Sequence, residues 1–517
     1  MITPELKHAI HGYTEKMSRS VTLILNTGEH PKKSELRDFL SQLASSSPRI
    51  EMMEQHNAAL RGPLSFAVSH DALSTGVQFS GIPGGHEFNS LVLAILHMGG
   101  MPTKLDDGIH DVIARVDQSL HFEIFVSLSC HNCPDVVQAL QQFAIMNHHI
   151  TAEMIDGGVH PELIHERNIQ GVPAVYLNGE PFANGKIDTA QLLHKLIERL
   201  PHLKNTDPIT RLPTQDITVI GGGPAGVAAA IYAARKGLAV TIVADRLGGQ
   251  VKDTQGIENL ISVPHTTGPQ LVENLKQHMN QYPITIKEHV RVETIEPGSI
   301  KNLILSSGEH IQTHTLIIAT GAKWRELGIP GERENIGSGV AYCPHCDGPF
   351  FAGRDVAVIG GGNSGIEAAL DLSGIVKSVT VYEFLPELKA DRVLVDQAEK
   401  RNNITLLTNV AAQEILADNG KVVALRYQDR ATGNQHQHEL AGVFVQIGLI
   451  PNSQFLDGVV ARTPNGEVLI NEKCETNTPG IFACGDVSTV PYKQIVIASG
   501  EGAKAALSAY EYHRDHV

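Results

Sequence analysis

Short apolar runs alternate with helical patterns over the first two hundred residues, and the alternation occurs twice. The run 21–26 (V-T-L-I-L-N) predicts a strand, and the spacing of apolar residues over 34–43 predicts a helix. About one hundred residues later, a predicted strand at 122–128 precedes a predicted amphipathic helix at 135–143. This pattern therefore predicts an internal repeat in the N-terminal region.

Each copy of this repeat continues with a proline, a short apolar strand and a turn. Pro63 precedes L-S-F-A-V and Pro173 precedes A-V-Y-L, and turns follow at 70–71 and 178–179. The second turn is Asn-Gly, a strong two-residue hairpin signal. We expect two β-α-β…β-β-α units side by side.

The pattern changes after residues 201–215, a segment with three prolines and no apolar periodicity, which predicts an exposed linker. Beyond it, a strand leads through a glycine-rich turn into a helix, twice. The strand 216–220 precedes G-G-G-P-A-G, and the strand 355–359 precedes G-G-G-N-S-G. This order predicts an α/β fold with two dinucleotide-binding domains.

Both glycine turns fit the dinucleotide fingerprint, whose glycines allow the tight turn, the approach of a pyrophosphate and the packing of helix on strand. A second strand follows each turn and ends at an acid, Asp245 or Glu383, at the spacing that suits a ribose hydroxyl. Glu383 would repel a 2′-phosphate, which favours NADH over NADPH. The alternative is a plain tight turn in an α/β core. The six glycines are Gly221, Gly223 and Gly226, and Gly360, Gly362 and Gly365.

Four of the six cysteines form two C-x-x-C pairs. The first, Cys130 and Cys133, stands at a strand-to-helix junction, where a helix N-terminus stabilises a thiolate, and Cys130 is expected to be the more exposed. The second, Cys343 and Cys346, precedes Asp347, a candidate proton donor and acceptor.

A zinc site is the alternative reading of the thiol pairs, but 210 residues separate them and they fall in different domains. We therefore expect no metal. Cys474 and Cys484 read as small buried residues.

The net charge of −15 disfavours nucleic acid as a partner. Hydrophobic residues make up 42% of the chain, which suits globular domains. No apolar run approaches the roughly 20 residues that span a bilayer, and the N-terminus lacks a signal-peptide core. We expect a cytoplasmic protein.

The C-terminal half of the chain resembles the low-molecular-weight thioredoxin reductase family. The resemblance rests on the two glycine signatures, A-T-G-A at 319–322, C-P-H-C-D-G-P at 343–349 and C-G-D-V at 484–487. The whole chain resembles the flavoprotein F subunits of bacterial alkyl hydroperoxide reductases. That likeness rests on the tandem N-terminal units, S-C-H-N-C-P-D at 129–135, G-V-P-A-V at 171–175 and P-Y-K-Q-I at 491–495.

The resemblance implies FAD and NADH as cofactors and a redox role for both thiol pairs. Electrons would pass from NADH to FAD, to Cys343–Cys346, to Cys130–Cys133 and to the disulfide of a separate peroxiredoxin. Cys346 would face the flavin, and Pro173 would follow a cis bond. The FAD contacts would be Gly221, Gly223, Pro224, Ala225, Gly226, Asp245, Gly249, Gln250, Asn259, Thr320, Gly321, Gly485, Asp486 and Gln494. The NADH contacts would be Gly360, Gly362, Asn363, Ser364, Gly365 and Glu383.

Two further features bear on the resemblance. The family commonly has A-G-D where this chain has Ala483-Cys484-Gly485-Asp486. The first thioredoxin-like unit lacks a C-x-x-C, so it cannot exchange disulfides. Glu87 is a candidate for tuning the neighbouring thiols.

The resemblance implies tandem thioredoxin-like folds followed by FAD- and NAD-binding Rossmann-like domains of three-layer ββα type, in a homodimer. The divisions are 1–100 (thioredoxin-like, without C-x-x-C), 101–200 (with it), 201–215 (linker), 216–333 (FAD, first part), 334–450 (NAD, with C-x-x-C) and 451–517 (FAD, second part). The expected activity is NADH-dependent reduction of a peroxiredoxin that removes alkyl hydroperoxides and hydrogen peroxide. One alternative is a thioredoxin reductase fused to its own thioredoxin-like domain and acting on general protein disulfides. Another is a redox-regulated binding module.

Overall fold

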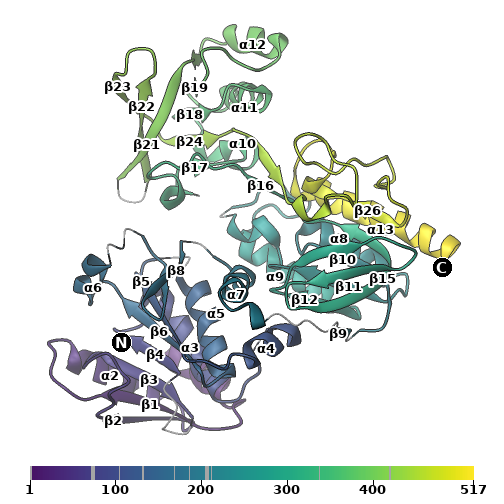
Figure 1. The fold of residues 1–517 in the computed structure, drawn as a ribbon. Helices are drawn as coiled ribbons and strands as arrows, with labels where there is room; N and C mark the ends of the chain where they lie inside the picture. Colours follow the sequence, from purple (N-terminus) through teal and green to yellow (C-terminus); the bar gives the residue numbers. More distant parts are fainter. Residues whose placement is uncertain are drawn as a thin grey trace.

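The computed structural model describes residues 3–70, 76–103, 105–130, 133–167, 169, 171–185, 187–203, 209–210, 212–254, 256–336, 338–418 and 421–517, apart from the side chains of 345 and 346. Figure 1 shows three bodies: an N-terminal module, a domain that carries the C-terminus, and a domain that lies farthest from the module. The turn expected at 70–71 extends outside the described residues.

The N-terminal module is built on one continuous sheet, whose described strands run in the order β2-β1-β3-β4-β6-β5-β7-β8. Its strands are β1 Val21–Asn26, β2 Ile50–Gln55, β3 Ser65–Ser69, β4 Val77–Ser80, β5 Leu120–Val126, β6 Ile150–Asp156, β7 Ala174–Leu177 and β8 Glu180–Asn184. Its helices are α1 Pro4–Thr14, α2 Lys33–Ala44, α3 Phe88–Met98, α4 Asp107–Ala114, α5 Cys133–Met146, α6 Pro161–Glu166 and α7 Thr189–Arg199.

The two halves of this sheet repeat one pairing pattern, which confirms the predicted repeat. In each half the first strand pairs in parallel with the second and antiparallel with the third, which pairs antiparallel with the fourth. The strands β4 and β6 pair in parallel and join the halves. The strand expected at 122–128 lies two residues earlier, because the chain turns at Ser127, whose carbonyl accepts from the N–H of Cys130.

A second sheet carries the first glycine signature. Its path is β12-β11-β10-β15-β14-β13, and β9 and β26 also pair with β15. Its strands are β9 Ile209–Thr210, β10 Gln215–Ile220, β11 Val240–Ala244, β12 Ile284–Glu288, β13 Val292–Glu296, β14 Lys301–Leu305, β15 Glu309–Ile318 and β26 Ile481–Ala483. The helices α8 Pro224–Ala234, α9 Gly268–Met279 and α13 Ile495–His516 belong to this body (Figure 1).

A third sheet, β17-β24-β18-β19-β20, carries the second glycine signature, next to the small sheet β21-β22-β23. The strands are β17 Val340–Ala341, β18 Asp355–Ile359, β19 Ser378–Tyr382, β20 Ile404–Leu407, β21 Val410–Asp418, β22 Lys421–Asp429, β23 Gln435–Glu439 and β24 Gly442–Val445. The helices are α10 Pro344–Asp347, α11 Asn363–Ser373 and α12 Arg392–Glu399. The ribbon of β16 Ala322–Trp324 and β25 Leu449–Pro451 joins this body to the second sheet.

The expectation of an exposed linker over 201–215 needs correction. Leu203 is fully buried, and its carbonyl accepts a hydrogen bond of 2.9 Å from Arg115. At the other end, β9 pairs with β15, and β10 already begins at Gln215. Apolar burial and strand pairing therefore hold both ends of the segment, while its residues 204–208 and 211 lie outside the described residues.

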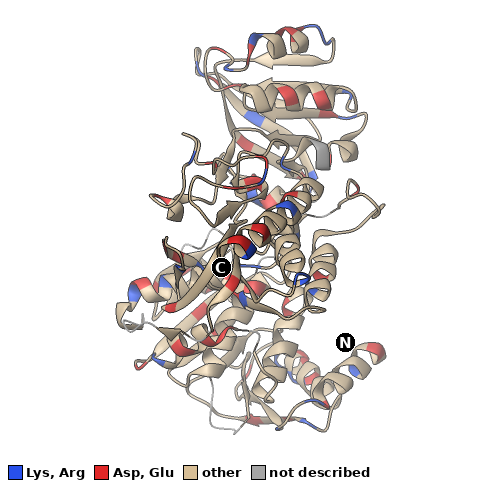
Figure 2. Cartoon of the chain, turned by 90° about the vertical axis from the view of Figure 1, so that its right-hand side faces the viewer, with Lys and Arg blue, Asp and Glu red and all other residues tan. Residues whose placement is uncertain are grey.

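Figure 2 shows basic and acidic positions interspersed over the bodies in that view, without a single basic face among the residues drawn in colour. None of the helices in the described part of the chain is long and apolar enough to cross a membrane.

Candidate active site

The first glycine turn leaves an open backbone cradle at the start of α8. Gly221 has a φ of +118°, and a side chain on Gly226 would place its Cβ 1.8 Å from the carbonyl oxygen of Gly221. A Cβ on Gly223, the N-cap of α8, would meet nothing within 4 Å. The first and third glycines are thus required by packing, while the second leaves room for a ligand. An open helix N-terminus of this kind suits a pyrophosphate.

The second glycine turn repeats this geometry at the start of α11. Gly360 has a φ of +120°, and a Cβ on Gly365 would lie 1.9 Å from the oxygen of Gly360. Gly362 caps the helix, and a Cβ on it would again meet nothing within 4 Å. The residues present therefore fit two dinucleotides, one at each turn.

The two acids that follow these turns have different surroundings. Glu383 is buried, and its carboxylate accepts backbone hydrogen bonds from Gly361 (2.5 Å) and Leu385 (2.7 Å), which hold it over the glycine turn. Asp245 accepts a hydrogen bond of 2.7 Å from the Nε of Arg291. Burial raises the pKa of Asp245 to about 6, although the charge of Arg291 opposes the shift.

Three of the predicted site residues come together from distant parts of the chain. The side-chain oxygen of Gln494 accepts from Asn259 (3.2 Å), and its nitrogen lies 4.0 Å from the sulfur of Cys343. Gln250 and Thr320 instead bond to the backbone, at the carbonyls of Ala322 and Asn452.

The remaining predicted contacts lie on turns and helix starts. Burial raises the pKa of Asp486, against the charge of Lys493. Asn363 exchanges two hydrogen bonds with Asp391. The other predicted residues lie in the first turn of α8 or α11, or in turns with left-handed glycines: Pro224, Ala225, Ser364, Gly249, Gly321 and Gly485.

The second thiol pair lies at the start of the short helix α10, with Cys343 immediately before its first residue, Pro344. Cys343 is disulfide-bonded, and its carbonyl accepts from the N–H of Asp347 (3.0 Å). The side chain of Cys346 lies outside the described residues. Burial raises the pKa of Asp347 to about 6, against a backbone hydrogen bond from Cys343. Asp347 can therefore hold or release a proton near neutral pH.

The first thiol pair forms a disulfide at the N-terminus of α5. Cys133 is fully buried and Cys130 is half-buried, which confirms that Cys130 is the more exposed. The N–H of Cys133 donates to the sulfur of Cys130 (3.2 Å), an arrangement that stabilises a thiolate there. The sulfur also lies 3.8 Å from the carbonyl of Val172, and the Val172–Pro173 bond is cis, as expected.

Comparisons with known proteins match both halves of this arrangement. Residues 215–502 match the pyridine nucleotide-disulphide oxidoreductase family, and residues 120–198 match the thioredoxin domain family. The chain is 44% identical over 516 residues to the F subunit of alkyl hydroperoxide reductase from Escherichia coli K12, a match that covers 99% of each chain. The chain belongs to the family of alkyl hydroperoxide reductase F subunits.

Two further similarities refine this placement. A protein of Ferdinandcohnia aciditolerans named NADH dehydrogenase is 45% identical over 514 residues, which cover 99% of this chain and 97% of that protein. The crystal structure of thioredoxin reductase from Streptococcus pyogenes covers 58% of this chain and 99% of its own, at 34% identity and a TM-score of 0.56. As a member of the family of alkyl hydroperoxide reductase F subunits, the chain is a disulfide oxidoreductase, and this family uses FAD and NAD(P)H.

Within this architecture, a lysine stands where the first thioredoxin-like unit would carry its buried cysteine. Strand β1 ends at residue 26 and α2 begins at Lys33, just as β5 ends at 126 and α5 begins at Cys133. The buried ammonium of Lys33 donates to the carbonyls of Asn26 and Pro63 and lies 3.4 Å from Glu54. In the first unit, a lysine and its hydrogen-bond and ion-pair partners therefore occupy the position of the buried cysteine, and no sulfur is present there.

Glu87 lies beside the loop that carries the first disulfide. It belongs to the short helix Gly85–Glu87, and the neighbouring N–H of His86 donates to the carbonyl of Leu128 in that loop. Burial raises the pKa of Glu87 to about 7, and the charge of Asp135 adds to the shift. The expected tuning role is thus compatible with its position, and it stays a prediction.

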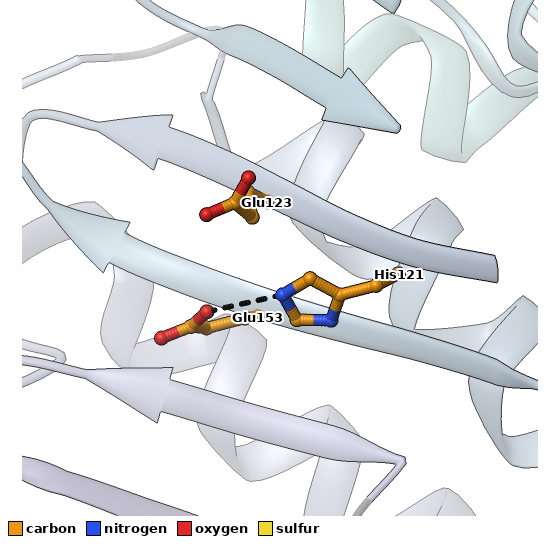
Figure 3. Close-up of side chains that lie close together, drawn as sticks. All are labelled: His121, Glu123 and Glu153. Atoms are coloured by element: carbon orange, nitrogen blue, oxygen red, sulfur yellow. Dashed lines mark ion pairs between the residues drawn. The ribbon is translucent and has the colours of Figure 1, made fainter. Parts of the chain in front are cut away.

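The side chains His121, Glu123 and Glu153 lie close enough to hold a metal ion (Figure 3). Arg61 binds both carboxylates, at 2.6 Å and 2.7 Å, and Arg167 binds Glu123 at 2.7 Å. Guanidinium groups therefore already neutralise the two acids. Arg61 follows β2 in the first unit, while the acids lie on β5 and β6, so the cluster fastens the two units together.

Sequence reasoning missed the basic partners of these sites, Arg61, Lys33 and Arg291. Arg61 and Arg291 lie in segments without a motif, and their partners are distant in the chain. Lys33 left a signal, because it lies one hundred positions before Cys133 at the same distance from its strand.

Proposed function

We propose that the chain is an NADH-dependent flavoprotein that reduces the disulfide of a separate peroxiredoxin and so supports the removal of alkyl hydroperoxides and hydrogen peroxide. The observation that carries this proposal is the presence of two open dinucleotide cradles and two C-x-x-C pairs in one chain. The name of the Escherichia coli relative supports the substrate class.

The two cradles divide the cofactors between two domains. The first signature with Asp245, in 216–333 and 451–517, would hold FAD, which supplies two-electron chemistry between a nicotinamide and a disulfide. The second signature, in 334–450, would hold NADH, with Glu383 on the free ribose hydroxyl. A carboxylate at that position disfavours the phosphate of NADPH.

The thiol pairs pass electrons on by disulfide exchange. Reduction of Cys343–Cys346 takes up two electrons and two protons and breaks one S–S bond. A thiolate of that pair attacks the Cys130–Cys133 disulfide, and the mixed disulfide is resolved by the second thiol, so one bond forms for each bond that breaks. Cys130 then attacks the disulfide of the peroxiredoxin. Asp347 takes up and returns a proton at Cys343–Cys346.

The partner and setting are part of this proposal. The electron acceptor is a peroxiredoxin like the peroxiredoxin subunit of alkyl hydroperoxide reductase. The chain forms a homodimer. It acts in the cytoplasm and binds neither nucleic acid nor membrane. Thiol pairs that must be reduced in order to work suit a reducing compartment.

The test follows NADH oxidation with a peroxiredoxin and a peroxide present, and with each omitted in turn. In Cys346→Ser, NADH should still reduce the flavin, but electrons should reach no disulfide. In Cys133→Ser, the Cys343 pair should remain reducible and peroxiredoxin turnover should cease. Cys474→Ser, at a buried cysteine outside both pairs, is the matched control. Normal turnover in Cys133→Ser would refute the path, and equal rates with thioredoxin would favour general disulfide reduction.

A further inference from the structure

The N-terminal module touches the sheet that carries the first glycine signature, named here the FAD-binding sheet, through a buried ion pair. Asp106 caps α4, and its Oδ1 accepts the N–H of Gly108 at 2.8 Å. Its other oxygen, Oδ2, lies 3.1 Å from the ammonium of Lys287 on β12. Lys287 also binds Glu309 at 2.8 Å, so it keeps a partner when the module leaves. The side chains of Asp106 and Lys287 are 10% and 6% exposed, which protects this pair from salt.

A second pair repeats the design on the same module. Asp188 caps α7, and its Oδ1 accepts the N–H of Gln191 at 2.8 Å as part of a capping box. Its Oδ2 lies 3.8 Å from the guanidinium of Arg291, which also binds Asp245. The side chains of Asp188 and Arg291 are 30% and 37% exposed, so salt reaches this pair more easily.

The module also contacts the rest of the chain near each pair, most tightly near the first. A Cβ placed on Gly108 would lie 2.7 Å from the hydroxyl of Ser307, in the turn between β14 and β15 of the FAD-binding sheet. A Cβ on Gly185, in the module, would lie 3.9 Å from the guanidinium of Arg333. Apolar side chains of the module and of this sheet also belong to one buried cluster. Acidic groups on the module thus meet basic groups on the sheet, over a contact to which apolar packing contributes.

We propose that Asp106 and Asp188, with Lys287 and Arg291, form a two-point electrostatic latch that seats the thioredoxin-like module on the FAD-binding sheet. Each acid uses one oxygen to cap its own helix and the other to reach the opposite domain. The latch stands whether or not the module carries electrons. Under the function proposed above, on which this consequence rests, the latch sets how often the Cys130–Cys133 pair is available to a separate protein.

Because each carboxylate caps its helix with one oxygen and meets the opposite domain with the other, its charge can be removed without removing the cap. Asparagine caps a helix as well as aspartate does, so Asp106→Asn and Asp188→Asn keep the caps and remove only the charge. We expect Asp106→Asn to lower the docking constant by about tenfold, because it removes a charge-assisted hydrogen bond. Asp188→Asn should lower it by about twofold to fivefold, as exposed pairs do.

Small-angle X-ray scattering of the full, FAD-loaded chain measures the result. The double variant should show a larger radius of gyration and a longer maximum dimension than the unaltered chain, with Asp106→Asn contributing more than Asp188→Asn. Salt at about 0.5 M should expand the unaltered chain and the Asp106→Asn variant, and it should change Asp188→Asn less.

The matched control is Asp107→Asn, which removes the same charge from the exposed first turn of α4. Scattering of the double variant that superimposes on the unaltered profile would overturn the latch, as would an equal expansion in Asp107→Asn. The measurement needs neither NADH nor a peroxiredoxin. Peroxiredoxin-linked NADH oxidation in the same samples tests the proposed function separately.

Discussion

Replacing Glu87 by glutamine tests how a buried carboxyl beside the N-terminal disulfide affects the module. Glu87 is fully buried, and burial raises its pKa from 4.5 to about 7. The folded state therefore binds this proton more tightly than the unfolded state does. Stability is lost as the pH rises above 4.5, and the full cost applies above pH 7. A shift of this size corresponds to about 3 kcal/mol.

Glutamine cannot ionise, so Glu87→Gln removes this cost. The variant should match the unaltered chain near pH 4.5 and exceed its stability by up to about 3 kcal/mol at pH 8. Hydrogen exchange of the full chain at pH 5, 7 and 8, corrected for the intrinsic exchange rate and read in peptides of α5, measures the module alone. Removing the negative charge should also favour the thiolate of reduced Cys130, and alkylation at pH 8 should be faster.

Glu35→Gln is the matched control, because Glu35 lies exposed on α2 of the same module. Its difference from the unaltered chain should be small at every pH. A stability difference in Glu87→Gln that stays constant between pH 5 and 8 would contradict the argument, since only an ionising Glu87 makes the difference grow with pH.

Three other substitutions test other parts of the chain. Arg61→Met leaves buried carboxylates short of their guanidinium and should destabilise the module by about 3–5 kcal/mol at pH 8, read by hydrogen exchange in β5 and β6. The loss should shrink toward pH 5 as Glu153 takes up a proton, and a loss that grows toward pH 5 would refute the reasoning. Glu383→Ala should weaken NADH binding by about tenfold in a fluorescence titration, whereas an unchanged Kd would show that Glu383 does not touch the ribose. Asp347→Asn should slow disulfide reduction by about a hundredfold while flavin reduction by NADH stays fast, and stopped-flow traces with equal rates for both proteins would remove Asp347 from proton transfer.

The dinucleotide turns could be predicted because their chemistry is local. The strand 355–359 has the bounds expected from the sequence, and Gly360 adopts the positive φ that the turn requires. A strand, a turn and a helix that follow one another leave a complete record in about thirty residues. The repeat of the N-terminal units was also recoverable, because each unit repeats its own order of elements.

The charge networks could not be predicted in the same way. Arg61 meets Glu123 and Glu153, which lie 62 and 92 positions later. Nothing in the local sequence of Arg61 distinguishes it from a solvated surface arginine. The register of β5 and β6 and the path of the loop after β2 determine which acids Arg61 contacts. Both are properties of the folded sheet. The anchored ends of segment 201–215 escaped prediction for the same reason.

The first thioredoxin-like unit keeps a structural role although it has no thiol pair. Lys33 fills the position of the buried cysteine with an ammonium that satisfies two carbonyls, so its charge is paired within the described part of the unit. Strand β4 covers the edge of β6, which would otherwise expose an unpaired strand. Arg61 then neutralises acids on β5 and β6 of the second unit. Because backbone pairing and ion pairs both cross the junction, the two units should move as one body, and the disulfide on α5 is held by a support twice the size of its own unit.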